Sequence, residues 1–242
     1  MVFSPSCVSP RIGETQDGLK TTQSSPKVLP ETVIYDVDLT MTMPPSLSAT
    51  SGLNAIAHAV EALYARDQNP IISLMAEEGI RSLARALPTI SARGNDIAAR
   101  TDALYGAWLC GCCLGAVGMA LHHKLCHTLG GTFDLPHAET HTIVLPHALA
   151  YNAPAVPDAM ARVSRAIGAA DASQGLYELA KRLGAKLALR DVGMPASGID
   201  KAADLAVTNA YWNPRPLERG AIRDLIARAW AGEPPVAIKA VA

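Results

Sequence analysis

The chain has 242 residues, of which 49% are hydrophobic and 18% are charged. This balance is typical of a soluble globular chain that buries a sizeable core, so disorder is not the expected state. Lysine and arginine number 21 against 22 acidic residues. The overall charge therefore gives no reason to expect a nucleic-acid or membrane-surface partner, and we predict neither.

The cysteines and the first residues bear on the cellular compartment. Five cysteines are present, and three of them crowd into one apolar stretch at Cys110, Cys112 and Cys113. An odd number in this arrangement favours reduced, buried thiols over a disulfide framework. Residues 1–11 lack a basic segment followed by an apolar one, so we expect no secretory signal and a cytoplasmic location.

The pattern along the chain predicts a mainly α protein with a short β or loop segment at its start. Residues 1–45 form a loop-rich connection, with turn formers and a short hairpin in 1–30 and a strand candidate at Thr32–Tyr35. A helical domain follows over 46–232, and 233–242 is a loose tail. We expect eight or nine helices. They span 51–66, 69–87 and 96–121, then a histidine-bearing helix that follows to 129, and then 140–152, 157–168, 173–189, 199–210 and 217–231.

Three sequence features define the boundaries in the first half of this domain. Asn69 followed by Pro70 is a strong helix start, Pro88 is expected to end that helix, and Gly130-Gly131 to stop the histidine-bearing one. The segment 103–121 carries no charge and contains Gly111-x-x-x-Gly115, which suits either a membrane-spanning helix or a closely packed central helix. Its Gly, Ala and Cys content and the basic residues that follow favour the central helix.

The histidines form the main candidate site. Five of the seven lie within twenty residues, namely His122, His123, His127, His137 and His141. His123 and His127 are four apart and share a helix face, as do Asn54 and His58, and a Gly-Gly turn can fold His137 back towards them. We therefore predict that two helix faces and one loop converge on a single pocket.

These residues resemble a known family. Ser51-Gly-Leu-Asn54-Ala-Ile-Ala-His58-Ala-Val-Glu61, His123-Lys-Leu-Cys-His127-Thr-Leu-Gly-Gly and Asp134-Leu-Pro-His137 are similar to the pattern of iron-containing alcohol dehydrogenases. Within that family, His122-His-Lys-Leu-Cys-His127 and Asn213-Pro-Arg-Pro216 resemble the maleylacetate reductases. The resemblance covers about residues 12–232 and implies the C-terminal helical domain of such an enzyme.

Family members carry a nucleotide-binding α/β domain ahead of the helical one. No Gly-rich turn lies between a strand and a helix here, so the sequence offers no phosphate cradle for a dinucleotide. We therefore expect the nucleotide-binding half to be missing, with 1–45 as a remnant of the interdomain region. The isolated chain is expected to be inactive and to bind NADH or NADPH poorly.

The resemblance also implies a metal site, because the family holds a divalent ion with one Asp and three His. The matching positions are Asn54, His58, His123 and His137. The amide of Asn54 is a weaker ligand than a carboxylate and leaves the set without an anion. We therefore predict a degenerate site that is substantially empty of metal.

The activity that the resemblance implies is NAD(P)H-dependent reduction of maleylacetate, with chloromaleylacetates as further substrates, to 3-oxoadipate in the breakdown of aromatic compounds. The substrate is a small dicarboxylic acid, and the complete enzyme is expected to be a homodimer. Maleylacetate has a double bond conjugated to a ketone, so hydrogen-bond donors can stabilise the enolate in place of a Lewis acid. A metal-dependent alcohol dehydrogenase and a non-catalytic helical remnant remain as alternatives.

The roles expected on this reading divide into three groups. His127 is the proton donor or enolate stabiliser, and His123 and Lys124 are the other catalytic residues. Lys124 attracts a substrate carboxylate, or else it is a solvated helix residue. His58, His137 and Asn54 line the substrate pocket, with Arg215 as a second carboxylate anchor at the rim. Glu61 either orients His58 or has an ordinary exposed or capping role, and His122, His141 and His147 are structural.

Overall fold

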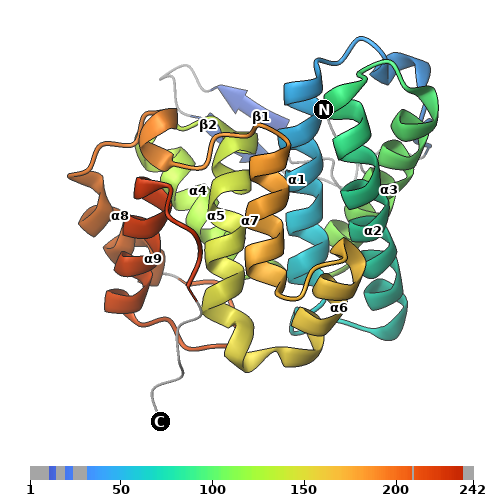
Figure 1. Ribbon diagram of the computed structural model, residues 1–242. Coiled ribbons are helices and arrows are strands. Elements are labelled where there is room, and N and C mark those ends of the chain that lie inside the picture. Colours follow the sequence, from blue (N-terminus) through green and yellow to red (C-terminus); the bar gives the residue numbers. More distant parts are fainter. Residues whose placement is uncertain (1–10, 15–19, 24–31, 209, 237–242) are drawn as a thin grey trace.

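Helices account for most of the residues that the computed structural model describes, which are 11–14, 20–23, 32–208 and 210–236 (Figure 1). Within these ranges the α-helices are α1 Pro45–Ala62, α2 Pro70–Ala92, α3 Ile97–Ala116, α4 Leu121–Phe133, α5 His137–Asn152, α6 Pro157–Ile167, α7 Ala172–Arg182, α8 Gly198–Val207 and α9 Arg219–Ala231. Short 3-10 turns lie at Asp38–Thr40, Ala153–Ala155 and Leu189–Val192. The predicted mainly α fold is confirmed.

The described part of the N-terminal segment contains one small sheet. Strands β1 (Arg11–Glu14) and β2 (Lys20–Gln23) pair antiparallel, as the predicted short hairpin requires. The strand predicted at Thr32–Tyr35 is wrong, because this segment pairs with no described strand. Its β-branched residues have no neighbouring strand to pack on, and Ile34 is 85% exposed.

The predicted helix starts hold better than the predicted ends. The Asn69 side chain accepts a hydrogen bond from the Ile72 N–H at 3.1 Å and so caps α2, as expected. However, α2 continues through Pro88 to Ala92. The proline removes one helical hydrogen bond, but Ile90 beyond it is buried against Ala86 and Ala99, which offsets that loss.

Two other predicted ends are also wrong. Gly130-Gly131 does not stop α4, which runs to Phe133 and ends where Asp134 adopts a left-handed conformation with φ of 51°. The helix expected over 173–189 ends at Arg182, and Gly184 follows with φ of 72°. In each case the residue with positive φ ends the helix, and the sequence pattern did not show which residue would take that role.

The predicted helix 96–121 is divided. Helix α3 ends at Ala116, and α4 begins at Leu121 after a bend of 93°. Among the described residues no single helix is long and apolar enough to cross a membrane, although α3 and α4 meet that test as a bent pair. The bend is stabilised by side chains of other segments, because the Gly118 N–H donates to the Asp67 carboxylate at 3.0 Å.

Two large hydrophobic clusters form most of the core, beside the small one around Ile90, and α5 lies between the two large clusters. One cluster joins α1, α2, α3, α6 and α7, and the other joins α4, α8 and α9 (Figure 1). Helix α5 contributes Leu145 and Leu149 to the first cluster and Ile143 and Val144 to the second. The central helix is therefore α5, which is buried from Thr140 to Asn152, and not the uncharged segment 103–121, whose Trp108 is 37% exposed.

Small residues allow α2 and α3 to pack closely, as the composition of α3 suggested. A Cβ atom at Gly106 would lie 3.0 Å from the Gly79 carbonyl oxygen and 2.9 Å from Leu83 Cγ. We therefore expect Gly106→Ala to lower the free energy of unfolding by about 1–3 kcal/mol, because the neighbouring backbone has to move. Urea denaturation measures this effect.

Gly220 provides the matched control, since a Cβ there meets no atom within 4 Å. Gly220→Ala should leave the stability unchanged or raise it by less than about 1 kcal/mol. Equal losses for both variants would contradict the close α2–α3 contact.

Candidate functional site

Six histidines from three helices lie in one cluster. They are His58 on α1, His122, His123 and His127 on α4, and His137 and His141 on α5. The ring centroids of His58 and His123 are 4.7 Å apart, those of His123 and His127 6.1 Å, and those of His137 and His141 4.1 Å. The predicted convergence of the two helix faces is thus observed, and His137 lies at the edge of the cluster.

The centre of the cluster is organised by Glu61, one turn beyond His58 on α1. Its carboxylate accepts hydrogen bonds from the backbone N–H groups of Ala120 and His122, both at 2.7 Å, and lies 2.7 Å from His123 Nδ1. Glu61 therefore caps the start of α4 and orients His123 at the same time. The capping role was one of the expected alternatives. The expectation that Glu61 orients His58 is wrong, because its carboxylate contacts the imidazole of His123.

Burial keeps these imidazoles neutral. Burial, together with the charges that the neighbouring His127 and His137 would carry, lowers the pKa of His123 to about 3. The pKa of His58 is also well below its usual value, first through burial and then through the charge that His123 would carry. Burial raises the pKa of Glu61, while His122 and the backbone donors act in the opposite direction.

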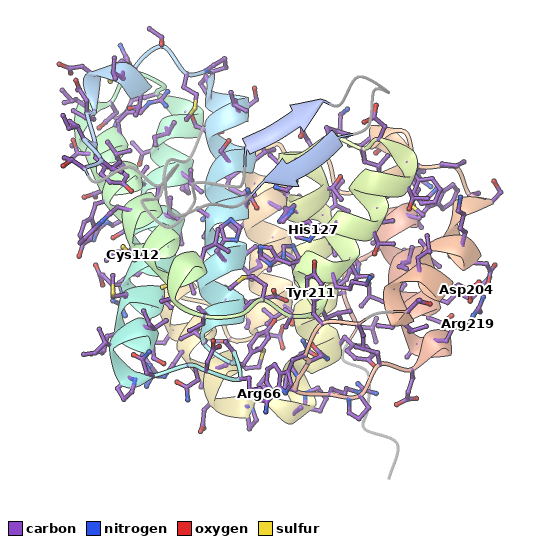
Figure 2. All side chains as sticks on the ribbon, turned by 180° about the vertical axis from the view of Figure 1, so that it is seen from behind. Arg66, Cys112, His127, Asp204, Tyr211 and Arg219 are labelled. Carbon is purple, nitrogen blue, oxygen red and sulfur yellow. The ribbon has the colours of Figure 1, made fainter. Side chains whose placement is uncertain are left out.

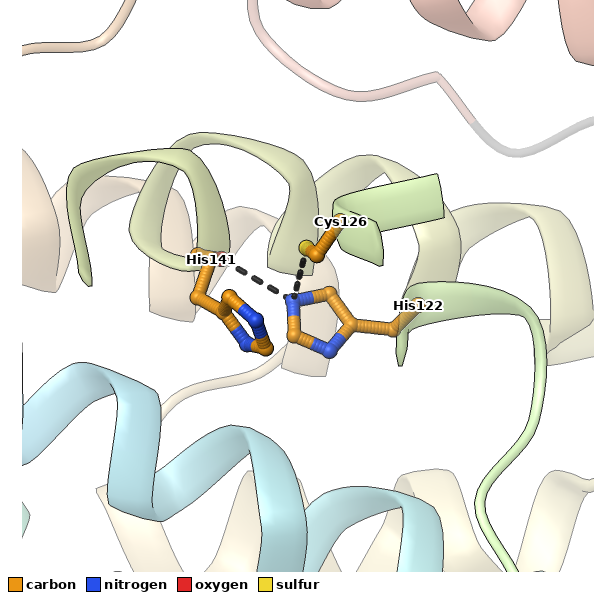
Figure 3. Close-up of side chains that lie close together, drawn as sticks. All are labelled: His122, Cys126 and His141. Atoms are coloured by element: carbon orange, nitrogen blue, oxygen red, sulfur yellow. Dashed lines mark hydrogen bonds between the residues drawn. The ribbon is translucent and has the colours of Figure 1, made fainter. Parts of the chain in front are cut away.

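Behind this centre lies a fully buried group formed by His122, Cys126 and His141 (Figure 3). His122 Nε2 is 3.0 Å from the His141 carbonyl oxygen and 3.5 Å from Cys126 Sγ. Neither ring nitrogen of His141 has a hydrogen-bonding partner among the described residues. The enclosure of His122 and His141 agrees with the structural roles predicted for them, and His147 lies apart, lining a cavity with Asp224 and Arg228.

The open side of the cluster is formed by His127 and Tyr211, which are labelled in Figure 2, together with Lys124. His127 Nδ1 lies 3.0 Å from the Tyr211 hydroxyl, and Lys124 Nζ lies 5.9 Å from the centre of the Tyr211 ring. A shallow cavity of about 300 Å³ is lined by these three side chains together with residues of α4 and α8. The His127 side chain is accessible from the cavity, but surrounding protein atoms still desolvate it and, together with His137, lower its pKa, so its imidazole is neutral near pH 7.

Sequence reasoning missed Tyr211. It lies 84 residues from His127, in the loop between α8 and α9, and no helical periodicity links the two positions. The only available indication was that Tyr211 directly precedes the Asn213-Pro-Arg-Pro216 turn. That turn was expected to reach the pocket with Arg215.

The expected role of Arg215 as a carboxylate anchor at the rim is not supported. Its guanidinium is buried, with 6% of the residue exposed, and stacks 4.3 Å from the centre of the Tyr151 ring. It also donates a hydrogen bond to the Tyr151 carbonyl oxygen at 3.0 Å. These contacts make Arg215 part of the packing between its loop and α5, because a buried cation requires such partners.

Comparison with known proteins places the fold. The family model for the C-terminal domain of Fe-containing alcohol dehydrogenases matches residues 48–230. The chain belongs to the iron-containing alcohol dehydrogenase family. It is 61% identical to a maleylacetate reductase of Sphingobium indicum over 97% of this chain and 66% of that protein. The chain thus spans about two thirds of the length of this relative.

Solved structures of the family agree with this. The crystal structure of maleylacetate reductase from Agrobacterium tumefaciens superposes with a TM-score of 0.90 at 55% identity, covering 96% of this chain and 66% of that one. A putative alcohol dehydrogenase from Ralstonia eutropha gives a TM-score of 0.91 at 61% identity, with the same coverage. The helical arrangement described above is therefore the family's C-terminal fold.

The family name implies a divalent metal, but the side chains at the matching positions do not fit one well. His58 Nδ1 and His123 Nε2 are hydrogen-bonded to each other at 2.6 Å, so these two imidazoles satisfy one another. The Asn54 oxygen Oδ1 is buried without a described partner, yet an amide brings no negative charge. His137 packs on His141 at the exposed edge of the cluster. We derive no chemistry from a metal here.

We expect the purified protein to contain far less than one equivalent of iron or zinc, and Asn54→Asp to raise this occupancy by restoring an anionic ligand. Elemental analysis after dialysis measures it. The control is Cys126→Ser, which removes the thiol of the other metal-competent group, His122, Cys126 and His141. Stoichiometric metal that persists in Cys126→Ser but disappears in His137→Asn would show that the family site is intact.

Proposed function

We propose that this chain is the substrate-binding helical part of an enzyme that reduces maleylacetate to 3-oxoadipate. The observation that carries the proposal is the open cavity where a neutral imidazole, a phenol hydroxyl and an ammonium group converge, on His127, Tyr211 and Lys124. The imidazole and the ammonium group are donors suited to a conjugated keto acid, which needs its enolate and carboxylates stabilised, while the hydroxyl donates to His127 Nδ1. The name of the 61% identical relative supports the same substrate.

The side chains have distinct tasks in this reaction. Reduction of the conjugated double bond transfers negative charge to the ketone oxygen. His127 then donates a hydrogen bond or a proton to the enolate, and the Tyr211 hydroxyl holds its other ring nitrogen, Nδ1, at 3.0 Å. Lys124 attracts one substrate carboxylate through its charge. We assign His58, Asn54 and His137 to the same proposed site, although they do not line this cavity and Asn54 Oδ1 is buried without a described partner.

The reductant in the proposed reaction is NADH or NADPH, which supplies a hydride. The described residues contain no parallel sheet and no Gly-rich turn between a strand and a helix, so they do not fit a dinucleotide on their own. We therefore propose that a nucleotide-binding part, corresponding to the third of the relatives that this chain does not span, is needed for turnover. The division into 1–45, 46–232 and 233–242, and a homodimeric complete enzyme, belong to the same proposal.

The direct test is to fuse the chain to the part of the Sphingobium indicum relative that it does not cover, and to follow NADH or NADPH oxidation with maleylacetate. We expect turnover by this completed chain and none by the 242-residue chain alone. A completed chain that folds but reduces simple aldehydes and leaves maleylacetate unchanged would support the alternative, a metal-dependent alcohol dehydrogenase. Asn54 argues against that alternative.

A further inference from the structure

The starting point is the charge state of Glu61. Its side chain is completely buried, and no described Lys or Arg forms an ion pair with it. Instead each carboxylate oxygen accepts a backbone N–H at 2.7 Å, from Ala120 and His122 at the N-terminus of α4. Backbone N–H groups can only donate, and the positive end of the helix dipole favours an anion, so these contacts favour the carboxylate and oppose the rise in pKa that burial causes.

A carboxylate fixes the tautomer of His123. Because the carboxylate can only accept, the 2.7 Å contact requires a proton on His123 Nδ1. In a neutral imidazole the other nitrogen, Nε2, then has no proton and must accept. The 2.6 Å contact with His58 Nδ1 is therefore a bond in which His58 donates.

We propose that Glu61 is a positioning residue that sets the direction of a hydrogen-bond chain from His58 to His123 to Glu61. The chain leaves His58 Nε2 without a proton and without a hydrogen bond to any described residue. His58 is half-buried on α1, beside His141 of the pocket cluster. It is thus a hydrogen-bond acceptor, for example for a water molecule, and not a second donor to the enolate.

This assignment separates the hydrogen-bond donors of the pocket from its acceptors. Only this separation rests on the proposed function. The donors, His127 and Lys124, lie on the open side beside Tyr211, whereas His58 Nε2 is an acceptor. The assignment also accounts for the poor fit to a metal. The lone pair of His123 Nε2, which would bind a cation at the family's metal position, already accepts the hydrogen bond from His58.

The tautomers are measured directly by NMR. In the full 242-residue chain labelled with ¹⁵N-histidine, long-range ¹H–¹⁵N correlations report which ring nitrogen of each neutral imidazole carries the proton. We expect Nδ1–H at both His123 and His58. No substrate or cofactor is present, so failure of the proposed function leaves this result unaffected.

The informative variant is Glu61→Gln, which keeps the size of the side chain and one oxygen for the cap. The Gln amide can donate to His123 Nδ1, so His123 should change to the Nε2–H form, with the proton order at His58 reversed. Glu178→Gln, at an exposed position on α7, should leave both imidazoles unchanged. Circular dichroism establishes that each variant is folded.

An Nε2–H tautomer at His123 in the unmodified chain would overturn the proposal. This measurement requires no variant, so it decides the question even if Glu61→Gln fails to fold or presents its amide oxygen to His123.

Discussion

His127→Ala in the completed chain is expected to lower kcat for maleylacetate by roughly 10²- to 10⁴-fold, the range typical of losing a general acid. The imidazole is the neutral donor at the open cavity, and an alanine leaves the developing enolate with one donor fewer. His127 is exposed, and within the described part of the chain its side chain hydrogen-bonds to Tyr211 alone, so the fold should remain nearly intact. Steady-state oxidation of the nicotinamide cofactor measures the loss.

Two further variants show whether the effect belongs to this position. Tyr211→Phe removes the hydroxyl that holds His127, and should cost roughly tenfold, the magnitude of one hydrogen bond. His147→Asn should change stability without a direct loss of rate, because His147 lies away from the cluster beside Asp224 and Arg228. Comparable losses of kcat at His127 and His147, or none at His127, would place the active site elsewhere.

The second large effect is expected in acid. Burial lowers the pKa of His122 and His147 to about 4 and that of His123 to about 3, below the usual value of 6.5. In the unfolded chain these imidazoles take up protons near pH 6.5, but in the folded protein they do not. Their stabilisation is therefore complete above pH 6.5 and is lost as the pH falls towards 4 and then 3.

Each such histidine contributes a slope of about 1.4 kcal/mol per pH unit, so the three together give at most about 4 kcal/mol per pH unit below pH 6. The raised pKa of Glu61 acts in the opposite direction and reduces the net effect. Urea denaturation at pH 7.5, 6.5, 5.5 and 5.0 measures the slope. His147→Asn should reduce it by about one histidine's share, and a free energy of unfolding that is flat across this range would contradict the burial of neutral histidines.

Local sequence patterns predicted the parts of the site that lie on single helices. The four-residue spacing placed His123 and His127 on one face, and Asn69-Pro70 marked the start of α2. Contacts between distant segments could not be read from such patterns. The Tyr211 contact with His127 depends on how a loop returns to α4, and the Glu61 contact with His123 depends on the bend before α4.

The failed helix boundaries have the same physical origin. A proline is a reliable stop only where nothing beyond it is buried, and Ile90 is buried beyond Pro88. Likewise Arg215 carries a charge that suits a substrate carboxylate, but the ring of Tyr151 and its carbonyl oxygen hold that charge inside the fold. Tertiary packing decided each outcome, and it is set by residues far away in sequence.

The position of α5 has a consequence for how the molecule unfolds. Leu145 and Leu149 belong to one hydrophobic cluster, and Ile143 and Val144 belong to the other. If α5 unfolds, apolar side chains of both clusters are therefore exposed to water. The two halves should therefore melt as one cooperative unit, with coincident transitions by different probes and slow amide exchange along α5 that matches global unfolding. Binding that tightens the histidine pocket, which α5 helps to form, will then raise the melting temperature of the helices on both sides.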